Sequence, residues 1–289
     1  MCVCRSAAAT PCRRSEGGIA LALLNDRVRI GLWVDSLQLG VKAGLQTLAA
    51  LGGQAAGLDA FGPEIAPRTL GATGRRGLAQ FLRSRGLALT ALGADVGGRR
   101  LADNQYLDAN LSRLREALQL ASDLGAHFLV VPAGHIPAKE DSSAGVLAEA
   151  AKALSNAAAS FGVRVCWQAG NEAAEVLRAF LEKHDSGEAL ALEFNPAAFV
   201  MRGHETLQAL QHLSVRLALV RATDQYRGGA EAPFGQGDVR WGELLIALSG
   251  LPGSAPLDLL ASSERAGSRV EALSAAVKRL QALRLNPLS

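Results

Sequence analysis

Eight short apolar segments, separated by stretches of helical periodicity, set the pattern of the chain after residue 27. The segments have the length of β-strands and lie at 28–34, 55–60, 87–92, 127–131, 163–167, 189–194, 215–222 and 256–261. Continuous apolar runs of this length are typical of parallel strands buried on both faces, although periodicity alone does not separate them from buried helices. The alternation predicts an α/β protein built from successive βα units.

The stretches between the strands carry apolar residues at intervals of three and four, which is the spacing of one helix face. The clearest sets are Leu107, Leu111, Leu114, Leu118, Ala121 and Leu124; Leu147, Ala150, Leu154, Ala157 and Phe161; and Val270, Leu273, Val277, Leu280 and Leu283. Glycine follows four of the predicted helices just before the next strand, at Gly52-Gly53, Gly86, Gly125 and Gly162. Glycine there adopts the left-handed conformation that ends a helix and turns the chain back.

Eight βα units in about 260 residues predict a single closed (β/α)8 TIM barrel over residues 28–289. The alternative is an open, doubly wound sheet, which would be expected to carry a GxGxxG fingerprint after its first strand. The chain instead reads Trp33-Val34-Asp35-Ser36 at that point. The barrel is therefore the better prediction.

The first 27 residues differ from the rest, because they show no apolar periodicity and contain Cys2, Cys4 and Cys12. A zinc site normally needs four well-spaced ligands, so we expect a disordered extension here rather than a metal site. The apolar piece at 19–24 is too short for a signal-peptide core, and Cys166 is the one cysteine after residue 27. We therefore expect a cytoplasmic protein.

The composition narrows the classes of partner. Thirty Lys and Arg against 27 Asp and Glu give a net charge of +3, and aromatic residues are only 4% of the chain. The basic residues are scattered and stacking platforms are scarce, so we expect no nucleic-acid binding. No apolar run reaches the roughly 20 residues that span a bilayer, so we expect no membrane partner. The sequence leaves a homo-oligomer open.

In a barrel of this kind the active site lies on the loops that follow the carboxyl ends of the strands. The polar residues at those positions are Asp35, Asp59, His135, Gln168, Asn171, Glu172, Glu193, Asn195, Arg221, Asp224, Ser262, Ser263 and Glu264. Side chains two apart on a strand share a face. If Asn195 points into the mouth of the barrel, Glu193 points into its interior one layer below.

Several of these stretches resemble one known family. They are Gly134-His135-Ile136-Pro137, the segments at 165–172 and 194–197, Arg221-Ala222-Thr223-Asp224, and the GQGDVRW loop at 235–241. Their order and spacing are similar to those of the xylose isomerase-like barrels, the sugar phosphate isomerases/epimerases. The pairing of the seventh strand with the GQGDVRW loop resembles that family's HxKD and GxGxxxW arrangement. The resemblance covers nearly all of the chain after residue 27.

The resemblance implies a divalent metal such as Mn, Mg or Zn, held by Glu, Asp, His and Glu at the ends of strands five to eight. The first three ligand positions correspond to Gln168, Asn195 and Arg221 of this chain. The fourth corresponds to Ser263, or to Glu264 if the alignment is shifted by one residue. Gln and Asn are neutral, and Arg does not give up its proton, so it would repel a cation. We therefore expect a mouth with no metal and no other cofactor.

A buried guanidinium needs a partner, because an unpaired buried charge costs several kcal/mol. Glu193 is the first candidate, since strands six and seven are neighbours, and Asp224 is the second. In one interpretation the ion pair is structural and replaces the organising role of the metal. In the other, Arg221 binds a small anionic or polyhydroxylated ligand. The other substrate-binding residues, which form hydrogen bonds with its hydroxyl groups, are Gln168, Asn195, Ser263 and Glu264.

His135 is the one histidine expected at the active face, so it is the best available proton shuttle, with Glu193 and Asp224 as further acid–base candidates. The long loop at 224–240 suits a phosphate site, a lid or an oligomer contact. Together these features predict a sugar or sugar-phosphate isomerase/epimerase-like protein whose metal ligands are replaced. The alternative is a non-catalytic barrel, a pseudoenzyme, that binds a carbohydrate-like or anionic molecule or a protein partner.

Overall fold

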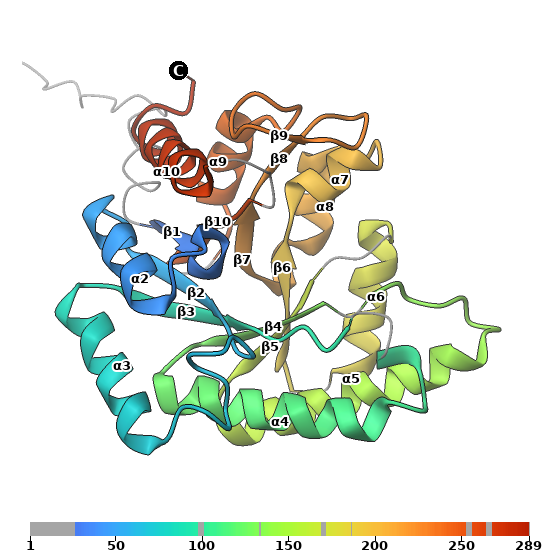
Figure 1. Ribbon diagram of the computed structural model, residues 1–289. Helices are drawn as coiled ribbons and strands as arrows, with labels where there is room; N and C mark the ends of the chain where they lie inside the picture. Colours follow the sequence, from blue (N-terminus) through green and yellow to red (C-terminus); the bar gives the residue numbers. More distant parts are fainter. Residues whose placement is uncertain are drawn as a thin grey trace, which may run out of the picture.

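The computed structural model describes residues 27–97, 101–132, 134–168, 172–185, 187–252, 256–263 and 268–288. Eight of its strands form a closed parallel barrel in the order β1-β10-β7-β6-β5-β4-β3-β2, surrounded by helices (Figure 1). The barrel strands are β1 Val28–Trp33, β2 Ala55–Asp59, β3 Ala88–Gly93, β4 Phe128–Pro132, β5 Arg164–Gln168, β6 Leu190–Phe194, β7 Leu217–Ala222 and β10 Leu257–Ala261. Each of the eight predicted strands is confirmed, and so is the single (β/α)8 TIM barrel. The predicted N-terminal extension lies, except for Arg27, outside the described residues.

The helices that cover the barrel follow the strands in sequence. They are α2 Val41–Ala50, α3 Ala72–Ser84, α4 Leu107–Leu124, α5 Ser142–Phe161, α6 Ala174–His184, α7 Pro196–Met201, α8 Thr206–Leu213, α9 Trp241–Ser249 and α10 Arg269–Leu285, with short 3-10 helices at Val34–Leu37 and Ser214–Arg216. None of the described helices is long and apolar enough to cross a bilayer.

The ends of the long helices follow from local chemistry. Asp141 caps α5, because its side chain accepts a hydrogen bond from the backbone N–H of Ser143. Helices α4 and α5 end at Gly125 and Gly162, whose φ angles of 75° and 65° are left-handed. These two glycines therefore act as the predicted C-caps.

The interior of the barrel is narrow and filled mainly by small side chains. Its buried cluster consists of Trp33, Ala55, Ala91, Val130, Cys166, Ala191, Ala218, Leu219 and Leu260. Trp33 is the large member, and a Cβ added at Gly57 would lie 2.5 Å from its indole ring. Glycine on β2 is thus what allows the indole of β1 to lie across the barrel.

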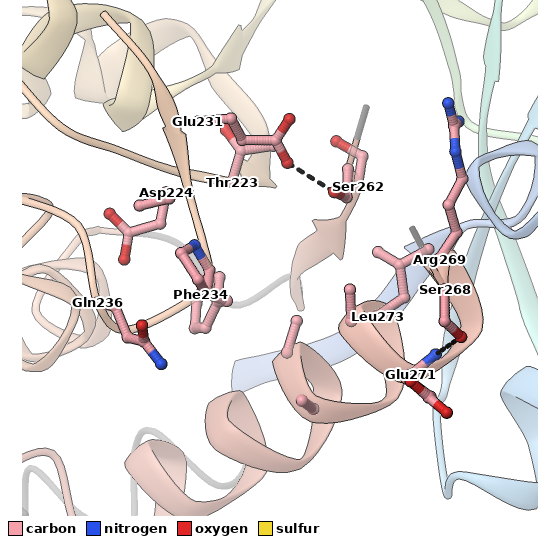
Figure 2. Close-up of a pocket in the computed structure, with 16 residues that line it drawn as sticks. Thr223, Asp224, Glu231, Phe234, Gln236, Ser262, Ser268, Arg269, Glu271 and Leu273 are labelled. Atoms are coloured by element: carbon pink, nitrogen blue, oxygen red, sulfur yellow. Dashed lines mark hydrogen bonds between the residues drawn. The ribbon is translucent and has the colours of Figure 1, made fainter. Parts of the chain in front are cut away.

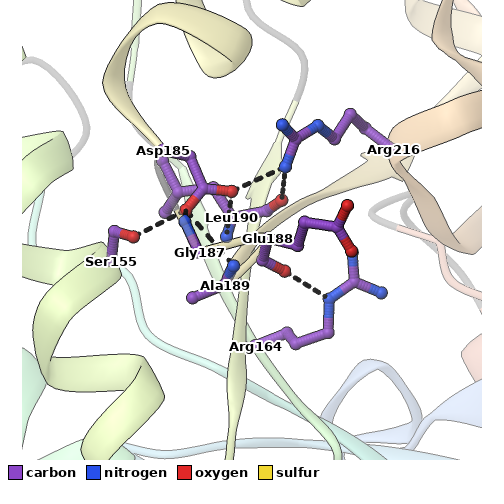
Figure 3. Close-up of polar contacts among 8 residues, drawn as sticks. All are labelled: Ser155, Arg164, Asp185, Gly187, Glu188, Ala189, Leu190 and Arg216. Atoms are coloured by element: carbon purple, nitrogen blue, oxygen red, sulfur yellow. Dashed lines mark hydrogen bonds and ion pairs between the residues drawn. The ribbon is translucent and has the colours of Figure 1, made fainter.

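Buried ion pairs lie at the amino-terminal end of the strands. Arg29 on β1 forms two hydrogen bonds of 2.6 and 2.8 Å to Asp258, its partner in register on β10, and Thr90 donates a third of 2.6 Å. Asp185, between α6 and β6, accepts hydrogen bonds from Ser155 and the backbone, and it pairs with Arg216 at 2.6 Å (Figure 3). These contacts fix one end of the barrel and leave the other end for a site.

Candidate functional site

The mouth of the barrel contains a buried acid and a partly buried base on neighbouring strands. Glu193 on β6 is fully buried, and its Oε1 lies 3.0 Å from Nη2 of Arg221 on β7, whose side chain is 20% exposed. The ion pair expected between these two residues is present. Each charge lowers the cost of burying the other.

Trp33 at the end of β1 completes this group. The guanidinium carbon of Arg221 lies 4.7 Å from the centre of the indole ring, which is cation–π geometry. The indole therefore supports one face of the guanidinium, and Glu193 lies at its edge. Together these residues, here called the Arg221 cluster (Trp33, Glu193 and Arg221), lie at the carboxyl ends of β1, β6 and β7.

Burial raises the pKa of Glu193 above its ordinary value of 4.5, and the charge of Arg221 and the indole of Trp33 offset only part of that rise. The low-dielectric interior disfavours the ionised form. The carboxyl group therefore holds a proton more readily than an exposed glutamate does.

Polar side chains surround the Arg221 cluster on the adjacent strands. Gln168 on β5 is the partner of Glu193 in register, and Asn195 follows two residues after Glu193. The hydroxyl of Thr223 donates to Oδ1 of Asn195 at 3.1 Å, and Nη1 of Arg221 lies 3.4 Å from the hydroxyl oxygen of Ser262. The structure therefore brings Gln168, Glu193, Asn195 and Arg221 to neighbouring strand ends.

The end of β10 contains a contact that the sequence did not predict. The hydroxyl of Ser263 donates to Oε1 of Glu231 at 2.6 Å, and Glu231 belongs to the hairpin of β8 Asp224–Gln225 and β9 Glu231–Ala232. The only signal for Glu231 in the sequence is its place in a long loop after the seventh strand. Glu264, the alternative ligand position, lies outside the described residues.

Asp224 holds the same hairpin in place. Its carboxylate accepts backbone N–H groups from Gln225, Gly235 and Val239 at 2.9, 2.8 and 3.3 Å. Burial raises the pKa of Asp224, and these backbone hydrogen bonds oppose the rise. The geometry favours a structural role for Asp224, and its acid–base role stays a prediction.

His135 lies away from this group of residues. Its Nδ1 is 2.9 Å from Oε1 of the buried Glu172, and its side chain is 61% exposed. The histidine lines a groove between α5 and α6 whose described lining includes neither Arg221 nor Glu193. The expected proton shuttle thus contacts Glu172 and lines a different groove, and its acid–base role stays a prediction.

The family model described as xylose isomerase-like TIM barrel matches residues 45–281 of the chain. The chain belongs to the xylose isomerase-like TIM barrel family. Solved structures agree with this fold. A xylose isomerase domain protein from Planctomyces limnophilus superposes with a TM-score of 0.75 at 20% identity, over 90% of this chain and 97% of that chain.

Two further solved structures with a similar fold are named for sugars. A D-psicose 3-epimerase from Clostridium cellulolyticum has a TM-score of 0.72 at 14% identity, over 89% of this chain and 99% of its own. A sugar phosphate isomerase/epimerase from Parabacteroides distasonis has a TM-score of 0.66 at 12% sequence identity, over 89% of this chain and 94% of its own. No curated protein matches the sequence. At these identities the likeness establishes the fold of this xylose isomerase-like barrel.

The residues expected at the metal-ligand positions of this xylose isomerase-like barrel can be compared with the donors that a divalent metal prefers. At the strand ends that the resemblance matches to the four ligands, the chain has Gln168, Asn195, Arg221 and Ser263. Hard divalent ions favour anionic oxygens and imidazole, whereas two amides and a guanidinium supply no negative charge. Within the described ranges, no group of three or more His, Cys, Asp or Glu side chains is placed to hold a metal ion.

A cavity of about 310 Å³ lies beside the mouth, between the β8–β9 hairpin and α10 (Figure 2). Strand ends contribute Thr223, Ser262 and Ser263, and the hairpin contributes Glu231 and the aromatic ring of Phe234. The start of α10 adds Ser268, Arg269 and Glu271. Hydroxyl groups, charges of both signs and one aromatic face therefore surround the same space.

Proposed function

We propose that this chain is an isomerase/epimerase-like barrel that has given up metal-dependent isomerisation and binds a small polyhydroxylated or anionic molecule. The observation that carries this proposal is the contact of Arg221 with Glu193 and Trp33 at the strand end where the resemblance calls for a metal-binding histidine. A permanent positive charge at that place opposes a divalent cation and favours an anion.

The cavity beside the mouth supports the binding half of the proposal. Its volume of about 310 Å³ is at the small end of the range typical of ligand sites. Serine and threonine hydroxyls both donate and accept hydrogen bonds, so Thr223, Ser262 and Ser263 suit the hydroxyl groups of a sugar. Arg269 and the N–H groups at the start of α10 suit a carboxylate or phosphate on the same molecule.

The other part of the proposal, the loss of metal-dependent isomerisation, follows from the chemistry of the residues in the mouth. A metal in such a barrel polarises the sugar carbonyl and contributes several kcal/mol of transition-state stabilisation. Here Glu193 is positioned to hold a proton, but Arg221 and Trp33 lie against it and it is fully buried. We therefore propose a pseudoenzyme in which the Arg221 cluster organises the mouth.

A second candidate function is isomerisation or epimerisation of a sugar. The likeness of the fold to a D-psicose 3-epimerase favours it, and Glu231 places a carboxylate at the end of β10. The buried thiol of Cys166, the one cysteine among the described residues, suits a reducing compartment, so we propose the cytoplasm as the location for either function.

Metal analysis and ligand binding on the purified full-length protein test the proposal. We expect less than 0.1 divalent ion per chain by elemental analysis, and no rise in melting temperature with Mn²⁺, Mg²⁺ or Zn²⁺. A sugar acid or sugar phosphate is expected to raise the melting temperature, and Arg269→Ala is expected to abolish that rise. One tightly held metal per chain, together with turnover of a ketose that chelation removes, would favour the second candidate.

A further inference from the structure

A groove of about 670 Å³ lies between α5 and α6, at the outer surface of the barrel. The loop after β4 closes one end of it, with His135, Ile136 and Lys139 among its lining residues. His184 at the last turn of α6 lines the other end. This groove is separate from the mouth and shares none of its described lining residues with the cavity beside α10.

The walls of the groove are apolar and open. The α5 wall carries Ala144, Gly145 and Ala148, and a Cβ added at Gly145 would meet no atom within 4 Å. On α6 the side chains are Val176, Ala179 and Phe180, and Val176 is 49% exposed. Small residues on one helix therefore leave room for an apolar group beside larger residues on the other.

An aromatic stack forms the floor of the groove. The ring of Phe180 lies 5.4 Å from that of the buried Trp167 and 4.8 Å from that of His184. Because Trp167 belongs to β5, its contact with Phe180 attaches this wall of the groove to the barrel. The groove is thus a preformed surface rather than a gap between two loose helices.

The ionisable side chains that line the groove are basic, although the carboxylate of Glu172 contacts His135 at the end formed by the loop after β4. The ionisable side chains that line it are His135, Lys139, Lys183 and His184. Burial lowers the pKa of His184, and the positive charges of Lys183 and Lys152 lower it further. Among the described residues, no recorded ion pair includes Lys152 or Lys183. At the α6 end of the groove the positive charge therefore comes from Lys183, and the described lining there includes no carboxylate.

From these features we propose that the groove binds a fatty-acid-like carboxylate. Its hydrocarbon chain lies along Phe180 and the small residues of α5, and its head group lies beside Lys183 and His184. The charge selects an anion, and the apolar walls select a chain rather than a sugar. The 11 residues of α6 give a length of about 16 Å, which suits an extended chain of medium length.

Calorimetric titration of the full-length protein with sodium decanoate tests the proposal, with 1-decanol as the uncharged probe. We expect one saturable decanoate site and binding of the alcohol that is about tenfold weaker. Gly145→Phe places a ring in the open space over α5 and is expected to weaken decanoate binding at least about tenfold. Its circular dichroism spectrum and its response to sugar ligands are expected to remain unchanged, because the mouth is a separate site.

Two matched lysine variants, one at the groove and one far from it, test the role of charge. Lys183→Glu is expected to weaken decanoate binding about tenfold, whereas Lys278→Glu, the same change on the exposed face of α10, leaves it unchanged. No saturable binding, equal losses in the two lysine variants, or full binding by Gly145→Phe would overturn the proposal. So would a dimer that Gly145→Phe converts to a monomer, because the occupant would then be a second copy of the chain.

Discussion

Oε1 of Glu193 lies 3.0 Å from Nη2 of Arg221, across the boundary between β6 and β7 at the mouth of the barrel. Neither charge is fully solvated, because the glutamate is buried and an indole covers one face of the guanidinium. The two residues therefore depend on each other, and a change to one leaves the other without compensation.

Removing one member of this pair is expected to destabilise the protein. Arg221→Met leaves Glu193 buried without its positive partner, and the expected loss in the free energy of unfolding is on the order of 3 kcal/mol. Urea denaturation measures it. The double variant Arg221→Met, Glu193→Met is expected to regain at least part of the loss. Equal midpoints for the wild type and Arg221→Met would contradict the importance of the pair.

Rebuilding the family's ligand set is expected to create metal affinity. The changes are Gln168→Glu, Asn195→Asp, Arg221→His and Ser263→Glu, which restore three carboxylates and an imidazole. Titration with Mn²⁺ is expected to give one site per chain in this variant and none in the wild type, because anionic oxygens and imidazole are the favoured ligands. The variant with Arg221 retained is the control, since its guanidinium still repels the ion. Comparable affinity in the wild type would disprove the explanation from donor chemistry.

Adding a methyl group at Gly57, which leaves space for the indole of Trp33, is expected to lower the free energy of unfolding. Gly57→Ala places a Cβ 2.5 Å from the indole, and the expected cost is about 1–3 kcal/mol in the free energy of unfolding. Gly77→Ala in α3, where a Cβ meets nothing within 4 Å, is the matched control and is expected to stabilise by roughly 0.5–1 kcal/mol. Thermal and urea unfolding of both variants check the contrast, and the same sign in both would refute it.

Asp185 gives a prediction for the dependence of stability on pH. Burial raises its pKa, but hydrogen bonds from Ser155 and the backbone and the charge of Arg216 outweigh burial, so the pKa falls below the ordinary value of 3.8. The folded state then binds the proton less tightly than the unfolded state. The stabilisation is present above pH 3.8 and is lost as the pH falls through the lower, folded-state pKa.

The measurement compares the wild type with Asp185→Asn across that window. The difference in the free energy of unfolding is expected to be largest near neutral pH and to shrink below pH 3.8. Asp108→Asn, a change at an exposed carboxylate on α4, serves as the control and is expected to show a much smaller difference. A difference between the wild type and Asp185→Asn that stays constant with pH would count against the ionised network.

Hydrogen exchange tests the structural role of Asp224. Asp224→Ala removes the acceptor for the N–H groups of Gly235 and Val239, so these amides are expected to exchange faster. Amides in the middle of α4 are expected to keep their exchange rates, because that helix does not depend on the hairpin. Unchanged protection at Gly235 would show that the hairpin is held by other contacts.

Much of the architecture is contained in local sequence pattern. The apolar runs mark the eight barrel strands because both faces of a parallel barrel strand are buried, which removes the alternation of a half-exposed strand. The ion pair of Arg221 and Glu193 was also predictable, because strands adjacent in sequence are adjacent in a barrel.

The parts that sequence did not predict depend on the paths of loops. His135 follows the fourth strand as expected, but its contact with Glu172 and its place in the groove beside α5 and α6 depend on the loop after β4. Glu231 reaches Ser263 only because the chain folds back as a hairpin, and no residue spacing encodes that meeting. The position of the Trp33 side chain in the barrel interior could not be predicted from the sequence, because the glycine that makes room for it lies on another strand.

The pairing of β1 with β10 has a consequence for synthesis of the chain. The strand at Val28–Trp33 leaves the ribosome before the other seven barrel strands, yet its partner at Leu257–Ala261 is the last barrel strand to emerge. Until then, Arg29 has no access to Asp258, and one side of the first strand has open backbone groups. The barrel therefore cannot close until its last strand in sequence order, β10, has been made, and until then the first strand keeps an unpaired edge.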